Sequence, residues 1–271
     1  MFKNHTIGFI GGGNMGEALI RGLVAASLFP AEKVFVYDII PSRIHYLEKE
    51  FGIKGRDSTG ELAESSSIIV LAVKPQVVSG SLNTIRAHLS HKPLVISIAA
   101  GISLSILEGL LPDGTAIVRV MPNTPALVLK GISALSRGKA VSAAQMEMSL
   151  ALFRSVGKAV EIDEKLMDAV TGLSGSGPAF VLLLIEALID AGVFMGLPRQ
   201  IARELVVQTV TGTSMMLDIT GKHPAELKDM ITSPGGTTIH GLQVLESYSV
   251  RGALIESVEA AARRSAELGK S

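Results

Sequence analysis

The deciding stretch is Ile7-Gly8-Phe9-Ile10-Gly11-Gly12-Gly13-Asn14-Met15-Gly16, an apolar run that leads into a glycine-rich turn. The run Ile7–Ile10 predicts a short buried strand. Met15, Leu19 and Leu23, four positions apart, predict a helix directly after the turn. Strand, Gly-x-Gly-x-x-Gly turn and helix in this order are typical of a dinucleotide-binding βαβ unit. The alternative is an ordinary glycine-rich turn.

Each glycine of the pattern has a physical role in such a unit. Gly11 permits the tight turn, Gly13 lets the backbone approach a pyrophosphate, and Gly16 lets the helix pack closely on the strand. The N-terminus of the helix then offers unpaired N–H groups and a positive dipole end to the phosphates.

The second predicted strand, Lys33–Asp38, ends in an acidic residue. Asp38 lies 22 positions after Gly16, where a carboxylate is expected to bind the ribose hydroxyl groups and to repel a 2′-phosphate, which favours NAD. Ser42 and Arg43 lie just beyond it and are suited to a phosphate instead. A solvated charge at the strand end is the third possibility for Asp38.

Strands alternate with helices over residues 1–163, which predicts a doubly wound, Rossmann-type parallel α/β domain. Further strands are predicted near Ile53 and at Ser67–Val73, Pro93–Gly101, Thr115–Met121 and Ala159–Ile162. Lys74 follows one strand end, which faces the ligand crevice of such a sheet, so it is expected to approach the cofactor or to remain a solvated surface lysine. The stiff loop Pro122-Asn123-Thr124-Pro125 follows another, and it either contacts ligand or only turns the chain.

The pattern changes after Asp163, and residues 164–271 predict an all-α domain. Its predicted helices are Glu164–Leu173, Pro178–Met195, Arg199–Leu217, Pro224–Met230, Thr238–Glu246 and Arg251–Leu268. The helix Pro178–Met195 is apolar on all sides except at Glu186 and Asp190. We expect it to be a buried helix covered by a partner subunit, not a membrane span.

Two polar stretches interrupt the helical half, Thr171–Pro178 and Ser233–His240. Both place hydroxyl groups and glycines directly before a predicted helix. Such a helix N-terminus suits a small anion, especially a carboxylate, which indicates a substrate site. Simple N-capping by serine or threonine is the alternative for each stretch.

Composition disfavours several other functions. Lys and Arg number 25 against 25 Asp and Glu, without a basic block, so nucleic acid is not an expected partner. The chain has no cysteine, and its six histidines are scattered without an HExxH pattern, so no metal site is expected. No signal peptide precedes the first strand, and we expect a cytoplasmic location. Hydride transfer, for which the cofactor carries the chemistry, remains the favoured reaction class.

Five motifs resemble the pyrroline-5-carboxylate reductase family: Phe9–Gly16, Ala72–Pro75, Met121–Pro125, Asp168–Ala179 and Ser233–Thr238. The resemblance covers the whole chain, and the last two motifs are the most specific. It implies a Rossmann domain followed by a helical dimerisation domain. It also implies reduction of 1-pyrroline-5-carboxylate to L-proline with NADPH or NADH, the last step of proline biosynthesis.

The resemblance also assigns residues to the site. Cofactor contacts are implied for Ile10, Gly11, Gly12, Gly13, Asn14, Met15, Asp38, Thr59, Ala72, Val73, Lys74, Pro75, Ile98, Ala99 and Ala100. Substrate contacts are implied for Glu164, Ser233, Thr237 and Thr238, and Thr171 and Thr238 are the candidate catalytic hydroxyl groups. We expect water or Thr171 to position the proton rather than drive its transfer. Homodimers interlocked through the helical domain, assembled into a larger ring such as a decamer, are implied as well.

Two departures leave the cofactor open. Asp38 stands where NADPH-preferring relatives often have serine, and Thr59 stands where many have asparagine near the adenosine ribose and phosphates. Two other functions also fit the first half of the chain. A β-hydroxyacid-type dehydrogenase needs a catalytic lysine on the first long helix of the second domain, and Pro178–Ile189 contains none. A non-catalytic, dinucleotide-binding regulatory protein would leave the two polar stretches without a purpose.

Overall fold

The computed structural model describes residues 2–269. Its contacts divide the chain into two compact units. The first holds the residues up to 176 and those from 260 onward, and the second holds residues 177–259.

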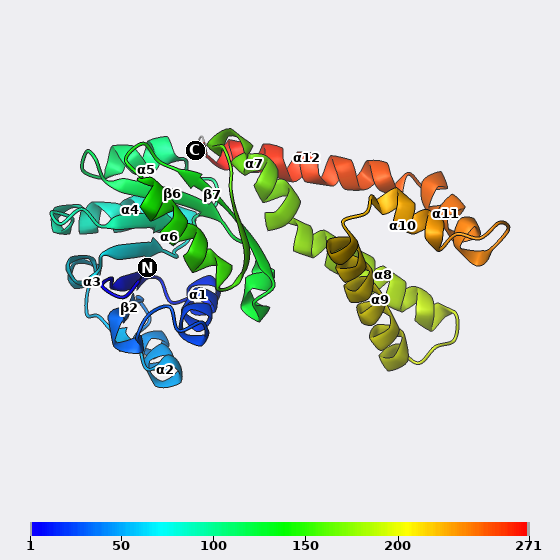
Figure 1. Cartoon of the computed structure of the whole chain (residues 1–271), viewed down its shortest axis with the longest axis horizontal. Coiled ribbons are helices and arrows are strands. Elements are labelled where there is room, and N and C mark those ends of the chain that lie inside the picture. The colour runs from blue at the N-terminus through cyan, green and yellow to red at the C-terminus, as the bar shows by residue number, and fades with distance from the viewer. Residues whose placement is uncertain (1, 270–271) are drawn as a thin grey trace. The chain divides into compact units, whose positions relative to one another are not determined.

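An eight-stranded sheet forms the centre of the first unit, and its strands occur in the order β3-β2-β1-β4-β5-β6-β7-β8 (Figure 1). The strands are β1 (Ile7–Ile10), β2 (Val34–Tyr37), β3 (Lys54–Gly55), β4 (Ile68–Leu71), β5 (Leu94–Ser97), β6 (Ala116–Met121), β7 (Gly131–Arg137) and β8 (Gly157–Glu161). The order reverses direction between β1 and β4, and ligands bind at such a switch point in open α/β sheets. The predicted doubly wound α/β fold is confirmed.

One strand of the sheet was not predicted. β7 pairs antiparallel with β6, while every other neighbouring pair of strands in the described sheet is parallel. Its sequence carries the buried Ser133 and Ser136, which interrupt the apolar run expected of a central strand. The short segment η3 (Thr124–Val128) joins β6 to β7, and an antiparallel neighbour needs no long crossover.

Helices cover both faces of the sheet, because successive side chains of each strand point to opposite sides. Ile68 and Val70 of β4 belong to one core cluster, and Ile69 and Leu71 to the other. The first cluster is completed by α1 (Asn14–Ala25), α2 (Pro41–Phe51) and α6 (Ala143–Arg154). The second is completed by α3 (Thr59–Ser65), α4 (Pro75–Ile85) and α5 (Leu104–Leu110).

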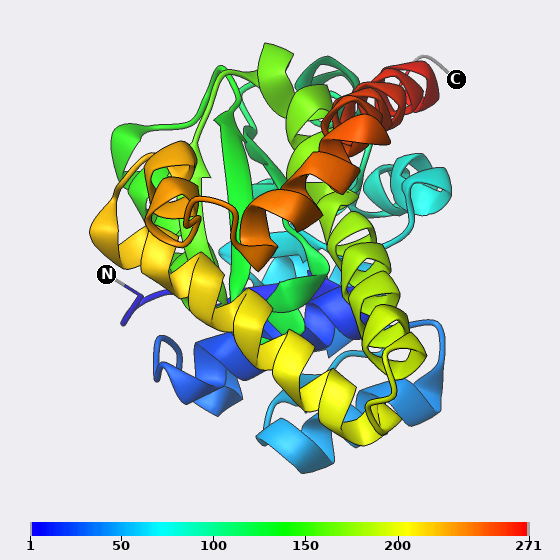
Figure 2. The same cartoon turned by 90° about the vertical axis from the view of Figure 1, so that its right-hand side faces the viewer.

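The second unit is entirely helical in its regular structure, as predicted (Figure 2). It consists of α8 (Gly177–Phe194), α9 (Arg199–Thr220), α10 (Pro224–Met230), α11 (Thr237–Ser247) and the start of α12 (Val250–Leu268). Helices α8 and α9 form a hairpin that turns at Gly196, where φ is +94°. The two helices meet closely, since a Cβ on Gly192 would lie 2.9 Å from Cβ of Ala202.

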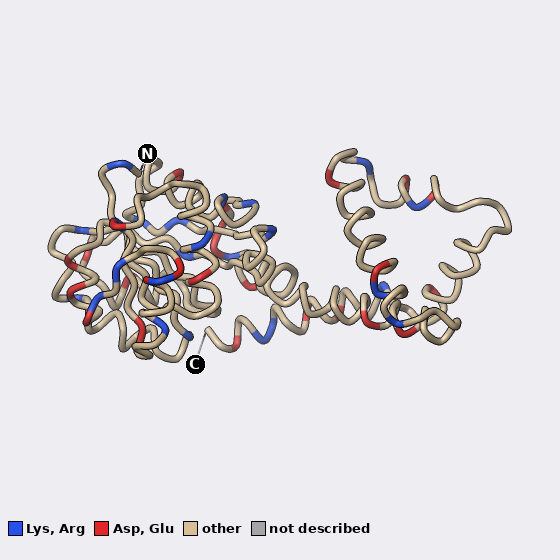
Figure 3. The backbone as a smooth tube through the Cα atoms, turned by 90° about the horizontal axis from the view of Figure 1, so that it is seen from below, with Lys and Arg blue, Asp and Glu red and all other residues tan. Residues whose placement is uncertain are grey.

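Helix α8 is exposed in the single chain, so its predicted burial depends on the partner subunit that is expected to cover it. No residue of α8, all of which lie within the described chain, is buried, and Leu183 is 64% and Phe194 90% exposed. Its apolar residues surround the helix, whereas α9 can cover only one side. The helical segment Glu164–Phe194 is long and apolar enough to cross a membrane, with a mean hydropathy of 1.9. In Figure 3, basic and acidic residues are scattered along the backbone.

The compact units do not divide the chain at the predicted boundary between residues 163 and 164. The short helical segments η4 (Glu164–Leu166) and α7 (Met167–Val170) belong to the first unit, together with the last turns of α12. Ser265 of α12 donates a hydrogen bond to Oδ1 of Asp168 at 2.7 Å, and both lie in the first unit. The helical half of the sequence therefore supplies part of the sheet-containing unit.

Candidate active site

The glycine turn between β1 and α1 has the geometry that its sequence requires. Gly11 has φ +103°, and a Cβ there would lie 2.5 Å from the carbonyl oxygen of Ala72. A Cβ on Gly16 would lie 2.4 Å from the carbonyl oxygen of Gly11. By contrast, a Cβ on Gly13 would meet no atom of the described residues within 4 Å. The backbone at Gly13 therefore faces open space at the start of α1.

Helix α1 begins without a side-chain cap. Gly13 is its N-cap residue, and within residues 2–269 no side chain accepts a hydrogen bond at this cap. The first turn of a helix carries N–H groups without partners inside the helix, and together with the dipole they attract anions. The turn thus fits a pyrophosphate at the switch point of the sheet.

A cavity of about 260 Å³ opens at the carboxyl ends of β4, β5 and β6. It is lined by Met15, Ala72, Val73, Lys74, Ile98, Ala100, Met121 and Pro122. The first six of these are predicted cofactor residues, and the structure brings them together. Its small and apolar side chains leave a shallow space that fits a flat nicotinamide ring beside the glycine turn.

Three other predicted cofactor residues lie beside this cavity without lining it. Ile10 and Ala99 are 2% and 3% exposed and pack in the second core cluster. Pro75 begins α4, and its ring fixes the first turn of that helix. Any contact of Ile10 or Ala99 with a cofactor would be made by the backbone.

Asp38 holds the glycine turn in place. Its Oδ2 accepts the N–H of Gly12 at 2.8 Å, and its Oδ1 accepts the N–H of Ile40 at 3.0 Å. It is therefore not a free, solvated charge. Each carboxylate oxygen has a second lone pair, so ribose hydroxyl groups can still donate to it. Arg43 binds the same glycine from the other side, because its Nε donates to the Gly12 carbonyl.

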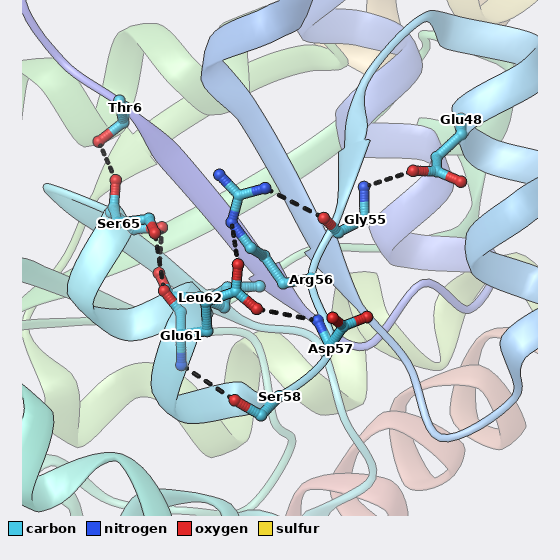
Figure 4. Close-up of polar contacts among 10 residues, drawn as sticks. Thr6, Glu48, Gly55, Arg56, Asp57, Ser58, Glu61, Leu62 and Ser65 are labelled. Atoms are coloured by element: carbon cyan, nitrogen blue, oxygen red, sulfur yellow. Dashed lines mark hydrogen bonds and ion pairs between the residues drawn. The ribbon is translucent and has the colours of Figure 1, made fainter.

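Thr59 is the first residue of α3, and a polar network fixes this part of the helix (Figure 4). Ser58 caps α3 by accepting the N–H of Glu61 at 3.1 Å. The Glu61 carboxylate accepts the N–H of Asp57 at 3.1 Å, and its other oxygen lies 3.4 Å from Nε of Arg56. The network holds Thr59 at the end of β3, on the side where the adenosine of a dinucleotide is expected.

The first polar stretch is itself helical, so the prediction that it precedes a helix N-terminus is wrong. Residues Thr171–Gly175 form a π-helical turn, closed by a hydrogen bond from the N–H of Ser176 to the carbonyl of Thr171 at 2.8 Å. The hydroxyl groups of Thr171 and Ser174 donate to carbonyl groups four residues earlier, at 2.9 and 3.1 Å. They do not cap the helix. Such π-turns are frequent at functional sites.

Asn123 ties the loop after β6 to this π-turn. It is buried, its Nδ2 donates to the carbonyl of Ser174 at 3.1 Å, and its Oδ1 accepts the N–H of Ile132 at 2.9 Å. The turn also approaches Met121 at the end of β6, since a Cβ on Gly175 would lie 2.5 Å from Cε of Met121. The loop therefore supports the π-turn, in addition to turning the chain.

Glu164 lies apart from the cavity beside the glycine turn. Its Oε1 accepts the N–H of Leu104 at 2.6 Å and pairs with Arg119 at 3.0 Å. Arg119 is buried in β6, so this ion pair joins the sheet to the start of α5. Glu164 lines a different cavity, of about 610 Å³, together with the ion pair of Arg137 and Glu161. Within this unit its carboxylate has a structural use.

The second polar stretch does precede a helix N-terminus. Ser233 accepts the N–H of Gly236 through its carbonyl at 3.0 Å, and Gly235 has φ +65°. The N-cap of α11 is Gly236, which has no side-chain cap in the described chain, and Thr237 and Thr238 are the first two helical residues. Capping by a hydroxyl group is thus not the role of this stretch. Its free N–H groups and hydroxyl groups fit a carboxylate.

Comparisons with known proteins identify the family. A family model described as pyrroline-5-carboxylate reductase dimerisation matches residues 164–268, and one described as NADP oxidoreductase, coenzyme F420-dependent, matches residues 6–101. The pyrroline-5-carboxylate reductase of Synechocystis sp. is 48% identical over 264 residues, which cover 97% of this chain and 98% of the relative. This chain belongs to the pyrroline-5-carboxylate reductase family.

Other reductases of the family agree over the full length. The relative from Methanosarcina acetivorans is 44% identical and is matched over 99% of both chains. The pyrroline carboxylate reductase of Plasmodium falciparum, solved with NADP bound, superposes with a TM-score of 0.90 at 39% identity, covering 98% of this chain and 99% of that one. Because the chain belongs to the reductase family, the alternative hypothesis of a β-hydroxyacid-type dehydrogenase is excluded.

Three site residues of this reductase were not assigned from the sequence. The sequence presents Asn123 only as part of a stiff loop, and the one signal for Arg119 is that it is the single charged residue in an apolar strand. Glu17 was signalled by its position directly after Gly16, where a negative charge is unexpected beside bound phosphates. Among residues 2–269, no group of three His, Asp or Glu side chains is placed to hold a metal ion.

Proposed function

We propose that this protein reduces 1-pyrroline-5-carboxylate to L-proline by hydride transfer from NADPH or NADH, the last step of proline biosynthesis. The observation that carries the proposal is the double role of Met121, which lines the cavity beside the glycine turn and approaches the π-turn at Gly175. The nicotinamide space and the hydroxyl of Thr171 thus lie on neighbouring elements of one unit. The family name of the relatives and the NADP-bound Plasmodium falciparum structure support it.

The residues of this chain bind, orient and polarise, and a bound nicotinamide supplies the hydride. The hydroxyl of Thr171 donates a hydrogen bond to the carbonyl of Met167, which leaves the lone pairs of the hydroxyl oxygen as acceptors. We assign them to the N–H of a protonated imine, the better electrophile. Thr171 then positions the reacting group without supplying the proton. In the second unit, Ser233, Thr237 and Thr238 offer N–H and hydroxyl groups at the start of α11, and we assign to them the binding of a carboxylate.

The test is an initial-rate assay with pyrroline-5-carboxylate, run separately with NADH and NADPH. We expect Thr171→Ala to lower kcat/KM for the imine by about 100-fold, as expected for a lost hydrogen bond to a charged group. Thr84→Ala is the matched control, because that hydroxyl donates to the Gly80 carbonyl on an exposed helix at 3.0 Å. Near-wild-type turnover by Thr171→Ala would contradict the assigned role. Wild-type protein that binds dinucleotide without imine-dependent oxidation would instead be the regulatory protein.

The exposed apolar helix supports a homodimer through the helical unit. Helices α8 and α9 border an open groove of about 670 Å³, in which apolar residues are joined by Glu186, Arg199 and Arg203. The family model matched there is a dimerisation model, and the charges of Glu186 and Asp190 disfavour a lipid-facing helix. Assembly into a larger ring such as a decamer, and a cytoplasmic location, stay predictions.

Light scattering after size-exclusion chromatography tests the assembly. We expect a mass of two chains or an even multiple, and Leu183→Glu, at a 64% exposed position on α8, should shift it towards one chain. Phosphatidylcholine vesicles should not carry the wild-type protein upward in a density gradient. Co-flotation together with a single-chain mass would favour a membrane role for α8.

A further inference from the structure

Glu17 is a carboxylate placed beside the site of the dinucleotide phosphates. It lies in the first turn of α1, directly after the glycine turn, and its side chain is only 16% exposed. One oxygen pairs with Arg43, and the other accepts a hydrogen bond from Arg21 at 2.6 Å. Partial burial raises the pKa of Glu17, but the hydrogen bonds from Arg43 and Arg21 outweigh it and hold the pKa below its usual value. The side chain is therefore ionised at neutral pH.

Arg43 is held by three contacts at once. Its Nη2 pairs with Glu17, its Nε donates to the Gly12 carbonyl, and its guanidinium lies 5.0 Å from the ring centre of Tyr46. Its side chain is 25% exposed. On the opposite side, Gly12 donates its N–H to Asp38. Two side chains of opposite charge, Arg43 and Asp38, therefore bind the carbonyl and the N–H of Gly12 in the phosphate-binding turn.

Asp38 and Arg43 are also the side chains expected to distinguish NADH from NADPH. A ribose with free hydroxyl groups can donate to Asp38, whereas a 2′-phosphate needs a cation with unused donors. Arg43 is the first Lys or Arg after the end of β2, where Asp38 lies, and a guanidinium binds phosphate best through two parallel N–H groups. Two of the Arg43 nitrogen atoms already donate to Glu17 and Gly12. Glu17 balances the charge of this guanidinium, and the two contacts fix it at the glycine turn, so it is less available to a 2′-phosphate than an unpaired arginine would be.

We propose that Glu17 is a specificity-determining residue, which holds Arg43 against the glycine turn and so disfavours the 2′-phosphate of NADPH relative to NADH. The inference rests on the proposed dinucleotide function, and it assigns Glu17 a positioning role exerted through Arg43. Without Glu17, the guanidinium gains a free edge, and the site loses a negative charge close to the phosphates.

Binding of two mononucleotides isolates the ribose end from the reduction. We expect Glu17→Gln to bind 2′,5′-ADP about tenfold more tightly than wild type by isothermal titration, the gain of one charge-assisted contact, and to bind 5′-AMP within about twofold of wild type. The ratio of kcat/KM for NADPH to that for NADH should rise by a similar factor, through KM and not kcat. In Glu17→Gln/Arg43→Gln the gain should disappear.

Glu147→Gln is the matched control, because it breaks another arginine–glutamate pair, with Arg154, on an exposed face of α6. It should change neither mononucleotide affinity. Equal weakening of 2′,5′-ADP and 5′-AMP in Glu17→Gln would show that the pair only shapes the glycine turn, and would overturn the proposal. So would unchanged binding of both. Glu17→Ala provides a second variant if the amide variant unfolds.

Because neither mononucleotide carries a nicotinamide, the result does not depend on imine reduction. A protein that discriminates the mononucleotides as expected but reduces no imine would retain this inference and lose the proposed function.

Discussion

Replacing Asn123 tests whether the loop after β6 supports the π-turn. The side chain is 8% exposed and satisfies two backbone groups, the carbonyl of Ser174 and the N–H of Ile132. Asn123→Ala removes both partners and leaves no replacement in the structure. A buried backbone group without a partner costs about 1–3 kcal/mol, so the loss of two partners should cost about 2–6 kcal/mol of folding free energy. For a unit of this size, at about 2–4 °C per kcal/mol, that lowers Tm by about 4–24 °C.

The effect on activity should exceed the effect on stability. Asn123 fixes the turn that carries Thr171, and a small displacement of a positioning group is costly to catalysis. We expect kcat/KM for the imine to fall more than about tenfold at a temperature where the variant is fully folded. The affinity for NADH should stay within about twofold, because neither hydrogen bond of the Asn123 side chain goes to the glycine turn. Circular dichroism melts, initial rates and NADH titration measure the three quantities.

The control is Thr115→Val, at the other end of β6. This variant also loses a partly buried side-chain hydrogen bond, from the Thr115 hydroxyl to the Pro112 carbonyl at 2.6 Å. It should cost about 1 kcal/mol of stability and leave kcat/KM unchanged. If Asn123→Ala were destabilised yet catalysed like wild type, the reasoning that links Asn123 to the π-turn would be refuted.

Four further outcomes follow from single contacts. Gly13→Ala should keep Tm within about 2 °C, since its Cβ meets no described atom within 4 Å, but weaken NADH binding in calorimetry at least about tenfold by filling the pyrophosphate space. Gly11→Ala, at φ +103° and against a backbone carbonyl, should lose about 2–4 kcal/mol in urea unfolding. The hydrogen bonds from Arg43 and Arg21 lower the pKa of Glu17 in the folded state, so its contribution to stability is present above the ordinary pKa of a glutamate and is lost as pH falls through the lowered one; urea titrations should show a shallower acid-side slope for Glu17→Gln. Ser265→Ala removes the 2.7 Å bond to Asp168, and amide hydrogen exchange should quicken in the last turns of α12.

Most of the fold could be predicted because local signals agree with the final packing. Helix α2 (Pro41–Phe51) carries its local signals at both ends: Pro41 lies in its first turn, and Gly52, at φ +69°, follows its last residue. Strands such as Ile68–Leu71 are apolar on both faces because helices cover both. Strand β7 was not predicted, because its serines are buried by the pairing of β7 with β6 and β8, and the neighbouring sequence carries no sign of that pairing.

The site was predictable where the backbone alone determines it. The glycine turn and the small residues at the strand ends, such as Ala72 and Ala100, meet in one cavity because parallel strands end at one edge. The π-turn was not predictable, since four of the five residues of Thr171–Gly175 are glycine, serine or threonine, which are typical of a loop. Its helical form depends on support from Asn123, 51 residues away in the sequence.

The role of Glu17 could not be predicted from the sequence, because it depends on side-chain partners from other parts of the fold. An acidic residue in the first turn of a helix is favourable to that helix by itself, because it faces the positive end of the dipole. The same dipole end is what attracts the phosphates of a dinucleotide, so the carboxylate and the ligand compete for one field. The competition is resolved only by tertiary contacts, since Arg43 from α2 and Arg21 from α1 both bind Glu17 and leave the cluster with Asp38 electrically balanced. Replacing Glu17 by a neutral residue leaves this cluster with a net positive charge, which would attract the 2′-phosphate of NADPH.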